Sequence, residues 1–196
     1  MCLIKSVKIQ EGFKVVFLVV CIFLVRIYFL KISIKNEKRI LKNGGSEFGV
    51  QNTKLLTVVH ILFYLSCLVE AVVRHAKFDT LSSLGLIFLL FSMGMLFWVT
   101  RLLGDIWTVK LMLVKDHRFV DHWLFRVVKH PNYFLNIIPE LIGLALLCHA
   151  TYSFLILFPV YMVILYRRIH EENNLLKTVI IPNGTVQSAA EITGNN

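Results

Sequence analysis

Two short polar clusters in the C-terminal half of the chain carry side chains suited to binding a polar ligand. One is the run Lys-His-Pro-Asn-Tyr at residues 129–133, and the other is Arg-Arg-Ile-His-Glu-Glu at residues 167–172. Arginine binds carboxylates in a fork, glutamate accepts hydrogen bonds from ammonium or hydroxyl groups, and histidine and tyrosine can donate or accept. These residue types can hold an ionic ligand if the fold brings the two clusters together.

Taken singly, each cluster also has a structural interpretation. Pro131 suits the first turn of a helix, where its missing N–H costs nothing. Arg167 precedes Glu171, and Arg168 precedes Glu172, by four residues, so each pair can interact along one helix face and solvate a helix end. On these residues alone both interpretations stay open.

Composition predicts an all-α polytopic membrane protein to position these clusters. The 196 residues are 57% hydrophobic and only 17% charged. Apolar tracts at 13–30, 55–73 and 81–100 match the roughly 20 residues that cross a bilayer. The tract at 137–166 is too long for one span and is interrupted near residue 150, which indicates a helical hairpin. We therefore expect five transmembrane helices, with the last two forming that hairpin and bringing the clusters to one membrane boundary.

Basic residues predict how the chain is oriented. Lysine and arginine accumulate between the first two spans and between the third and fourth, so these loops are expected in the cytoplasm. The net charge of +9 is then topogenic rather than a sign of nucleic-acid binding. The four cysteines lack C-x-x-C spacing, so no metal site is expected.

The sequence predicts one integral membrane domain over residues 1–177. Its candidate catalytic half lies at about 101–177. Residues 178–196 are weakly patterned and are expected to form a disordered tail. The polar interval 101–136 is long for a connector and holds several aromatic residues, which indicates either a functional loop or interfacial anchoring.

Four short sequence blocks follow one another in this half. They read His-Arg-Phe-Val at 117–120, Trp-Leu-Phe at 123–125, Lys-His-Pro-Asn-Tyr at 129–133, and Arg through Glu-Glu to Leu at 167–175. In this order they resemble the isoprenylcysteine carboxyl methyltransferase family, whose pattern is H-x-L-V, G-x-Y, R-H-P-x-Y and R-x-x-x-E-E-x-x-L. The departures are Phe119 for Leu, Trp123 for Gly, Phe125 for Tyr and Lys129 for Arg, and the usual F-G-x-x-Y continuation is missing.

The resemblance implies an enzyme that transfers a methyl group from S-adenosyl-L-methionine, with its cofactor pocket at the cytoplasmic interface. Methyl transfer from a sulfonium needs alignment and exclusion of water more than a strong base. The cofactor contacts that the resemblance implies are His117, Arg118, Phe119, Val120, Phe125, His130, Pro131, Asn132, Tyr133, Glu171 and Glu172.

The resemblance also assigns Arg167 to the acceptor, because a guanidinium stays charged and can hold a carboxylate or enolate. Glu140 is a second candidate for catalysis and substrate binding. On a helix Tyr133, Asn136 and Glu140 share one face, so Glu140 either lines the pocket below the cofactor or is a buried hydrogen-bonding group. His60 lies within a span, whereas Glu70 and His149 are expected near the outer interface.

The acceptor is expected to be lipophilic and to enter from the bilayer. The family label implies a prenylated cysteine carboxyl group. Residues 35–38 and 44–47, however, look like the first cytoplasmic loop of a bacterial branch that methylates alkylpyrones and related lipid-like hydroxy compounds. This places the protein in a bacterial cell membrane, in contact with membrane lipid and with its active site facing the cytoplasm.

Two other functions remain open. One is a membrane reductase of the sterol reductase type, which has a similar His-Pro-x-Tyr segment and uses NADPH, although such chains generally carry about ten spans. The other is a catalytically inactive, lipid-binding membrane scaffold, which the altered Trp123 and Phe125 allow.

Overall fold

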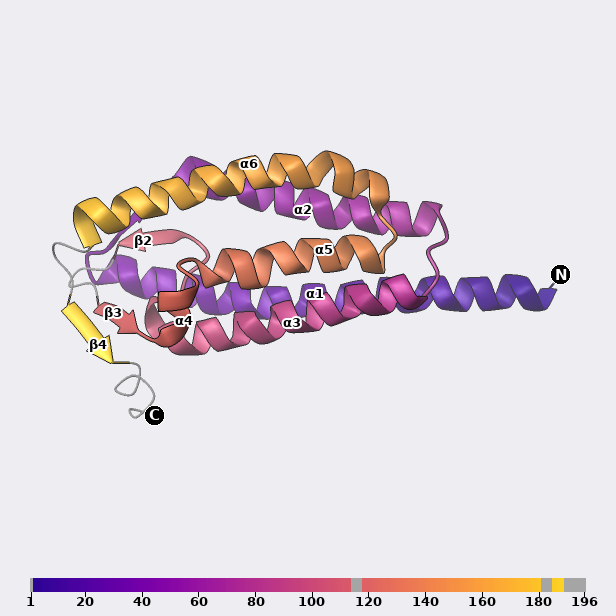
Figure 1. Cartoon of the computed structure of the whole chain (residues 1–196), viewed down its shortest axis with the longest axis horizontal. Helices are drawn as coiled ribbons and strands as arrows, with labels where there is room; N and C mark the ends of the chain where they lie inside the picture. The colour runs from indigo at the N-terminus through magenta and orange to yellow at the C-terminus, as the bar shows by residue number, and fades with distance from the viewer. Residues whose placement is uncertain (1, 114–117, 181–184, 189–196) are drawn as a thin grey trace.

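The computed structural model describes residues 2–113, 118–180 and 185–188, and it is a bundle of helices (Figure 1). Four stretches of this part of the chain are long and apolar enough to cross a membrane: Gly12–Lys42, Val50–Val73, Thr80–Ile106 and Thr151–Thr178. The prediction of a helical integral membrane protein is therefore confirmed.

The elements in chain order are α1 (Cys2–Lys42), β1 (Ser46–Phe48), α2 (Val50–Val73), α3 (Thr80–Leu103), a 3-10 turn (Gly104–Ile106), β2 (Leu111–Leu113), β3 (Arg118–Asp121), α4 (Trp123–Val127), a π-helical segment (Asn132–Ile137), α5 (Ile138–Leu147), α6 (Thr151–Leu175), a second π-helical segment (Leu176–Ile180) and β4 (Thr185–Ser188).

The expected count of five spans is not confirmed. The apolar helix that precedes α6, Asn132–Leu147, is shorter than the other four. Its six π-helical and ten α-helical residues rise at most about 24 Å, less than the ~30 Å of a hydrocarbon core. The chain does turn back after α5, through residues 148–150, where His149 has a positive φ.

The first helix is longer than the sequence predicts. The segment from residue 31 was expected to be a cytoplasmic loop, but α1 continues to Lys42. Residues 31–43 contain no glycine or proline, and Gly44, which takes a positive φ, follows the end of the helix. Several of the basic residues expected in a loop thus lie on the last turns of α1.

Two pairs of packed helices form the bundle. Helix α3 packs along α5, and α2 packs along α6, with α1 beside α2 and α3. Gly85 and Gly143 allow the α3–α5 approach, because a Cβ built on Gly85 would lie 2.4 Å from the backbone nitrogen of Leu147. Small residues at such crossings are typical of membrane helices.

Short strands gather at one end of the bundle, which we call the strand-bearing end (Figure 1). Strands β1 and β2 pair antiparallel, with Ser46 opposite Leu113, and β3 and β4 pair parallel, with Arg118 opposite Thr185. These strands were not expected in an all-α chain. Residues 185–188 of the tail take part in this pairing, whereas most of the tail predicted to be disordered lies outside the described residues.

Candidate functional site

The two polar clusters meet at the strand-bearing end. His130 and Tyr133, at the start of the π-helical segment, both contact Glu172 on α6. The His130 Nδ1 lies 3.1 Å from Glu172 Oε1, and the Tyr133 hydroxyl donates to Glu172 Oε2 at 2.6 Å. The other ring nitrogen of His130 lies 3.1 Å from Asn173 Oδ1. These bonds fix the start of the helix that precedes α6 against the C-terminal part of α6.

Arg168 joins this cluster to the rest of the fold. Its side chain is buried, donating to Thr53 Oγ1 at 2.7 Å, to the Tyr133 hydroxyl at 3.3 Å and to the Val109 carbonyl at 3.5 Å. The expected direct pair of Arg168 with Glu172 is replaced by an indirect one, because both side chains bond the Tyr133 hydroxyl. One guanidinium thus links α6 to α2 and to the loop before β2.

Arg167, the arginine that sequence reasoning selected, points the other way. It is exposed, and it makes no hydrogen bond or ion pair within the described ranges. The helical phase of α6 is the signal that distinguishes the two arginines. Arg168 lies seven residues after buried Tyr161 and seven before buried Leu175, so it shares their buried face.

Glu171 is the unusual member of the cluster. Its Oε2 atom is buried and has no hydrogen-bond partner among the described residues. Gly49, the residue before α2, lies directly against it, since a Cβ on Gly49 would sit 2.4 Å from this oxygen and 3.2 Å from Arg168 Nη1. A buried acceptor without a donor is costly, and such groups call for an explanation such as an absent ligand.

The close approach of Gly49 gives a testable expectation. Gly49→Ala should displace the Glu171 carboxylate, because the added methyl group overlaps Oε2 and the positive φ of 59° is strained for alanine. We expect at least a tenfold loss in affinity for any ligand of Glu171, such as S-adenosylhomocysteine measured by calorimetry. Gly94→Ala is the matched control, because a Cβ there meets no atom within 4 Å. Equal affinities for the two variants would contradict this role of Gly49.

Lys110 fixes the neighbouring part of the site. Its ammonium group donates to Glu37 of α1 at 2.5 Å and to Glu47 of β1 at 3.0 Å. These two hydrogen bonds raise the pKa of Lys110 above its usual value. The end of α1, strand β1 and the loop before β2 are therefore held together beside Gly49.

A second polar group lies deeper in the bundle. The carboxylate of Glu140 on α5 is fully buried, where it pairs with Arg26 of α1 and accepts from Arg26 Nε and from the Tyr64 hydroxyl, each at 2.5 Å. Asn136 accepts from Arg26 Nη2 at 3.0 Å and from Ser92 Oγ at 3.0 Å. The Asn136 amide donates to Asn132 at 3.0 Å, so the deep group touches the 129–133 cluster.

Tyr133, Asn136 and Glu140 are all buried, in agreement with the single face expected from their spacing. The segment Asn132–Ile137 is π-helical, a geometry that is frequent at functional sites. Sequence reasoning did not select Arg26, Tyr64 or Asn136 as site residues. A charged residue in the middle of an apolar span was the one signal for Arg26.

The other predicted cofactor contacts lie in different surroundings. Pro131 is buried beside His130, and Phe125 packs against an apolar cluster that includes Phe29 and Trp107. His117 lies outside the described residues. Arg118, Phe119 and Val120 form strand β3, and only their backbone is described.

The aromatic substitution in the second block faces outward. Trp123 is 56% exposed and its ring lies 5.7 Å from that of Trp98, between ring centroids. Tryptophan at a membrane boundary is typical of interfacial anchoring.

Glu70 and His149 lie at the opposite end of the bundle from this site, near the end of α2 and the start of α6. Glu70 accepts from the backbone N–H of Ser153 at 2.9 Å and thereby caps the start of α6. The His149 ring contacts Asp79 and Ser82.

Comparisons with known proteins agree with the order of the four sequence blocks. Residues 85–178 match the model of the isoprenylcysteine carboxyl methyltransferase (ICMT) family. An uncharacterized protein of Haemophilus influenzae is 43% identical over 156 residues, which cover 80% of this chain and 91% of that protein. The uncharacterized protein YpbQ of Bacillus subtilis is 30% identical over 145 residues, which cover 73% of this chain and 84% of that protein.

No solved structure matches the chain significantly. The family match spans α3, both polar clusters and α6, and it favours a membrane methyltransferase over the reductase alternative. The chain therefore belongs to the isoprenylcysteine carboxyl methyltransferase family.

Proposed function

We propose that this protein is an S-adenosyl-L-methionine-dependent O-methyltransferase that acts on a lipophilic acceptor. The observation that carries the proposal is the buried Oε2 of Glu171, which has no hydrogen-bond partner among the described residues and lies inside the cluster formed by the two family blocks. The cofactor brings an ammonium group and ribose hydroxyls, which are the donors that such a carboxylate oxygen lacks. The residues present therefore fit the cofactor that the family uses.

The other side chains of the cluster have supporting roles. His130 and Tyr133 are satisfied by Glu172, so they hold the segment before α5 in place rather than presenting free polar atoms. Arg168 fixes α6 beside Thr53 and keeps Glu171 next to Gly49. The further cofactor contacts that the family resemblance implies, from His117 to Val120 and at Phe125, Pro131 and Asn132, belong to the proposal.

When bound, the cofactor would supply a methyl group on a sulfonium. An acceptor oxygen would attack the methyl carbon in line as the carbon–sulfur bond breaks, and S-adenosylhomocysteine would leave. The protein then has to align the acceptor oxygen and exclude water. An acidic enol or carboxylate acceptor is already ionised near neutral pH, so a cation and a positioning carboxylate suffice. Glu140, and Arg167 at the membrane boundary, are the candidates taken from the sequence.

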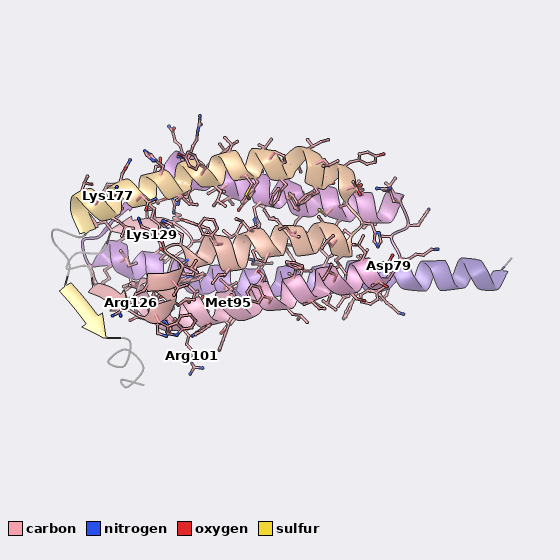
Figure 2. The ribbon with its side chains drawn as sticks, viewed as in Figure 1. Asp79, Met95, Arg101, Arg126, Lys129 and Lys177 are labelled. Carbon is pink, nitrogen blue, oxygen red and sulfur yellow. The ribbon has the colours of Figure 1, made fainter. Side chains whose placement is uncertain are left out.

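Basic residues support the orientation that we propose. Arg101, Arg126, Lys129 and Lys177 all lie toward the strand-bearing end in Figure 2, and Asp79 lies at the opposite end. Lysine and arginine next to membrane spans favour the cytoplasmic side. The proposed cofactor site would then open to the cytoplasm, and the acceptor would arrive from the bilayer. Because both relatives above are bacterial, we infer a bacterial cell membrane.

Cofactor binding tests the proposal. Purified protein in detergent should bind S-adenosylhomocysteine saturably in calorimetry. Asp105→Asn should bind it equally well, because Asp105 is an exposed acid that pairs with Arg39 on the surface. Lipid extracts from expressing cells should contain a species heavier by one methylene than in non-expressing cells. Absence of S-adenosylhomocysteine binding by the unaltered protein would contradict the methyltransferase proposal.

A further inference from the structure

The deep polar group contains an arginine and a histidine that the packing leaves accessible. Arg26 lies ten residues before Asn36, whose amide bonds the carbonyls of Gly104 and Trp107 near the strand-bearing end. At about 1.5 Å per residue, Arg26 is roughly 15 Å further into the bundle. Its side chain is 19% exposed and that of His60 is 24% exposed, whereas the side chain of Glu140 behind them has no exposure.

These two partly exposed side chains each carry a nitrogen that makes no hydrogen bond to the described residues. Arg26 uses Nε and Nη2 for its bonds to Glu140 and Asn136, and Nη1 makes no hydrogen bond to the described residues. His60 contacts Tyr161 through Nδ1, and its Nε2 lies 3.8 Å from Glu140 Oε1, too far for a hydrogen bond. In a hydrocarbon environment, polar groups left without a partner are costly.

The arrangement is also polarised. The Glu140 side chain is fully enclosed, whereas the Arg26 side chain is 19% exposed, so a group that approaches the ion pair meets the residue with the positive charge. A buried ion pair is a poor source of stability, since apolar residues of similar size often replace one without loss. Ionisable residues at membrane depth more often serve a substrate or an ion.

The deep group is connected to the proposed cofactor site. Asn136 bonds Arg26 on one side and Asn132 on the other, and Asn132 belongs to the same block as His130 and Tyr133. A ligand held at Arg26 therefore lies on the bilayer side of that block. Arg26 and His60 come from α1 and α2, which lie before the stretch that matches the family model.

We propose that Arg26 and His60 form the subsite that binds the anionic oxygen of a lipophilic acid, as a carboxylate or an enolate. This adds to the proposed function the residues that hold the acceptor oxygen, and it rests on that function. Glu140 and Asn136 are positioning residues here, because they hold the guanidinium while Nη1 faces the ligand. The acceptor oxygen is thus held by two residues of the N-terminal half of the chain, outside the stretch that matches the family model.

Binding of a lipophilic acid tests the subsite without the cofactor. The protein is placed in phosphatidylcholine nanodiscs, and carboxyl-labelled dodecanoic acid is titrated and followed by NMR. We expect saturable binding that an undecyl-substituted hydroxypyrone displaces and dodecanol does not. Displacement by the pyrone shows that an enolate oxygen is accepted as well as a carboxylate. Equal displacement by dodecanol would overturn the anionic assignment.

A double variant separates binding from structure. Arg26→Gln with Glu140→Gln removes both charges together, so no unpaired charge remains to destabilise the fold. We expect it to bind dodecanoic acid at least tenfold more weakly and S-adenosylhomocysteine as before. Arg74→Gln with Glu70→Gln, which removes an Arg–Glu pair at the other end, is the matched control and should bind the acid normally. Unchanged acid binding by the Arg26 double variant would overturn the proposal.

His60→Phe keeps the ion pair intact and provides the test if the double variant does not fold. It should weaken binding of dodecanoic acid severalfold while S-adenosylhomocysteine binding is unchanged, and normal acid binding by this variant would overturn the role of His60. The two proposals fail separately. Loss of S-adenosylhomocysteine binding in the unaltered protein contradicts the methyltransferase function, whereas loss of acid binding contradicts only the subsite.

Discussion

Glu140→Ala is expected to destabilise the protein by about 3–5 kcal/mol, the cost typical of removing one partner from a buried ion pair. Arg26 would remain at membrane depth with Asn136 as its one strong acceptor, and the Tyr64 hydroxyl would lose the carboxylate to which it donates. The measurement is the free energy of unfolding from a reversible titration with sodium dodecyl sulfate in mixed micelles.

Glu70→Ala is the matched comparison for this effect. Glu70 also pairs with an arginine, Arg74, but the Arg74 side chain is 46% exposed and can be solvated when the glutamate is removed. Its loss should cost about 1–2 kcal/mol, mainly through the cap on α6. Similar costs for Glu140→Ala and Glu70→Ala would show that Arg26 is not held as a buried charge.

Glu171→Ala should have the opposite profile, with a large loss of binding and no loss of stability. The lost carboxylate would bond a charged or hydroxyl donor of the cofactor, which is worth about 1.5–3 kcal/mol, or roughly 10- to 150-fold in affinity for S-adenosylhomocysteine. Removal of a buried oxygen that no described residue bonds should leave the free energy of unfolding unchanged or raise it.

Glu172→Ala provides the contrast on the next residue. Glu172 is bonded by His130 and Tyr133, so its removal should lower both the free energy of unfolding and the affinity. Calorimetry and unfolding measured on the same preparations distinguish the two. A stability loss for Glu171→Ala as large as that for Glu172→Ala would make Glu171 a structural residue.

The choice between Arg167 and Arg168 illustrates where sequence reasoning stops. The motif spacing selected Arg167, but burial depends on which face of α6 packs into the fold, and that face carries Tyr161, Arg168 and Leu175. The role predicted for Arg167 in acceptor binding stays a prediction. Its test is whether Arg167→Ala impairs turnover while cofactor binding is kept.

The order of the four sequence blocks determined the family, because neighbouring residues carry that pattern and the family match covers the same stretch. Composition and the length of the apolar tracts determined that the chain is a helical membrane protein, since a bilayer requires long apolar helices whose backbone bonds are internal. These properties are local, so they can be read without knowing which segments touch.

The tertiary structure alone decided which polar side chains meet. Arg26 and Glu140 are 114 residues apart, and Gly49 reaches Glu171 from the turn between β1 and α2, so no local pattern records either contact. The fold also decided that one oxygen of Glu171 has no partner in the part of the chain that the structure describes, while both oxygens of its neighbour Glu172 are bonded. Such differences arise from the packing of α1, α2, α5 and α6 around one another, because burial and hydrogen bonding depend on neighbours in space rather than along the chain.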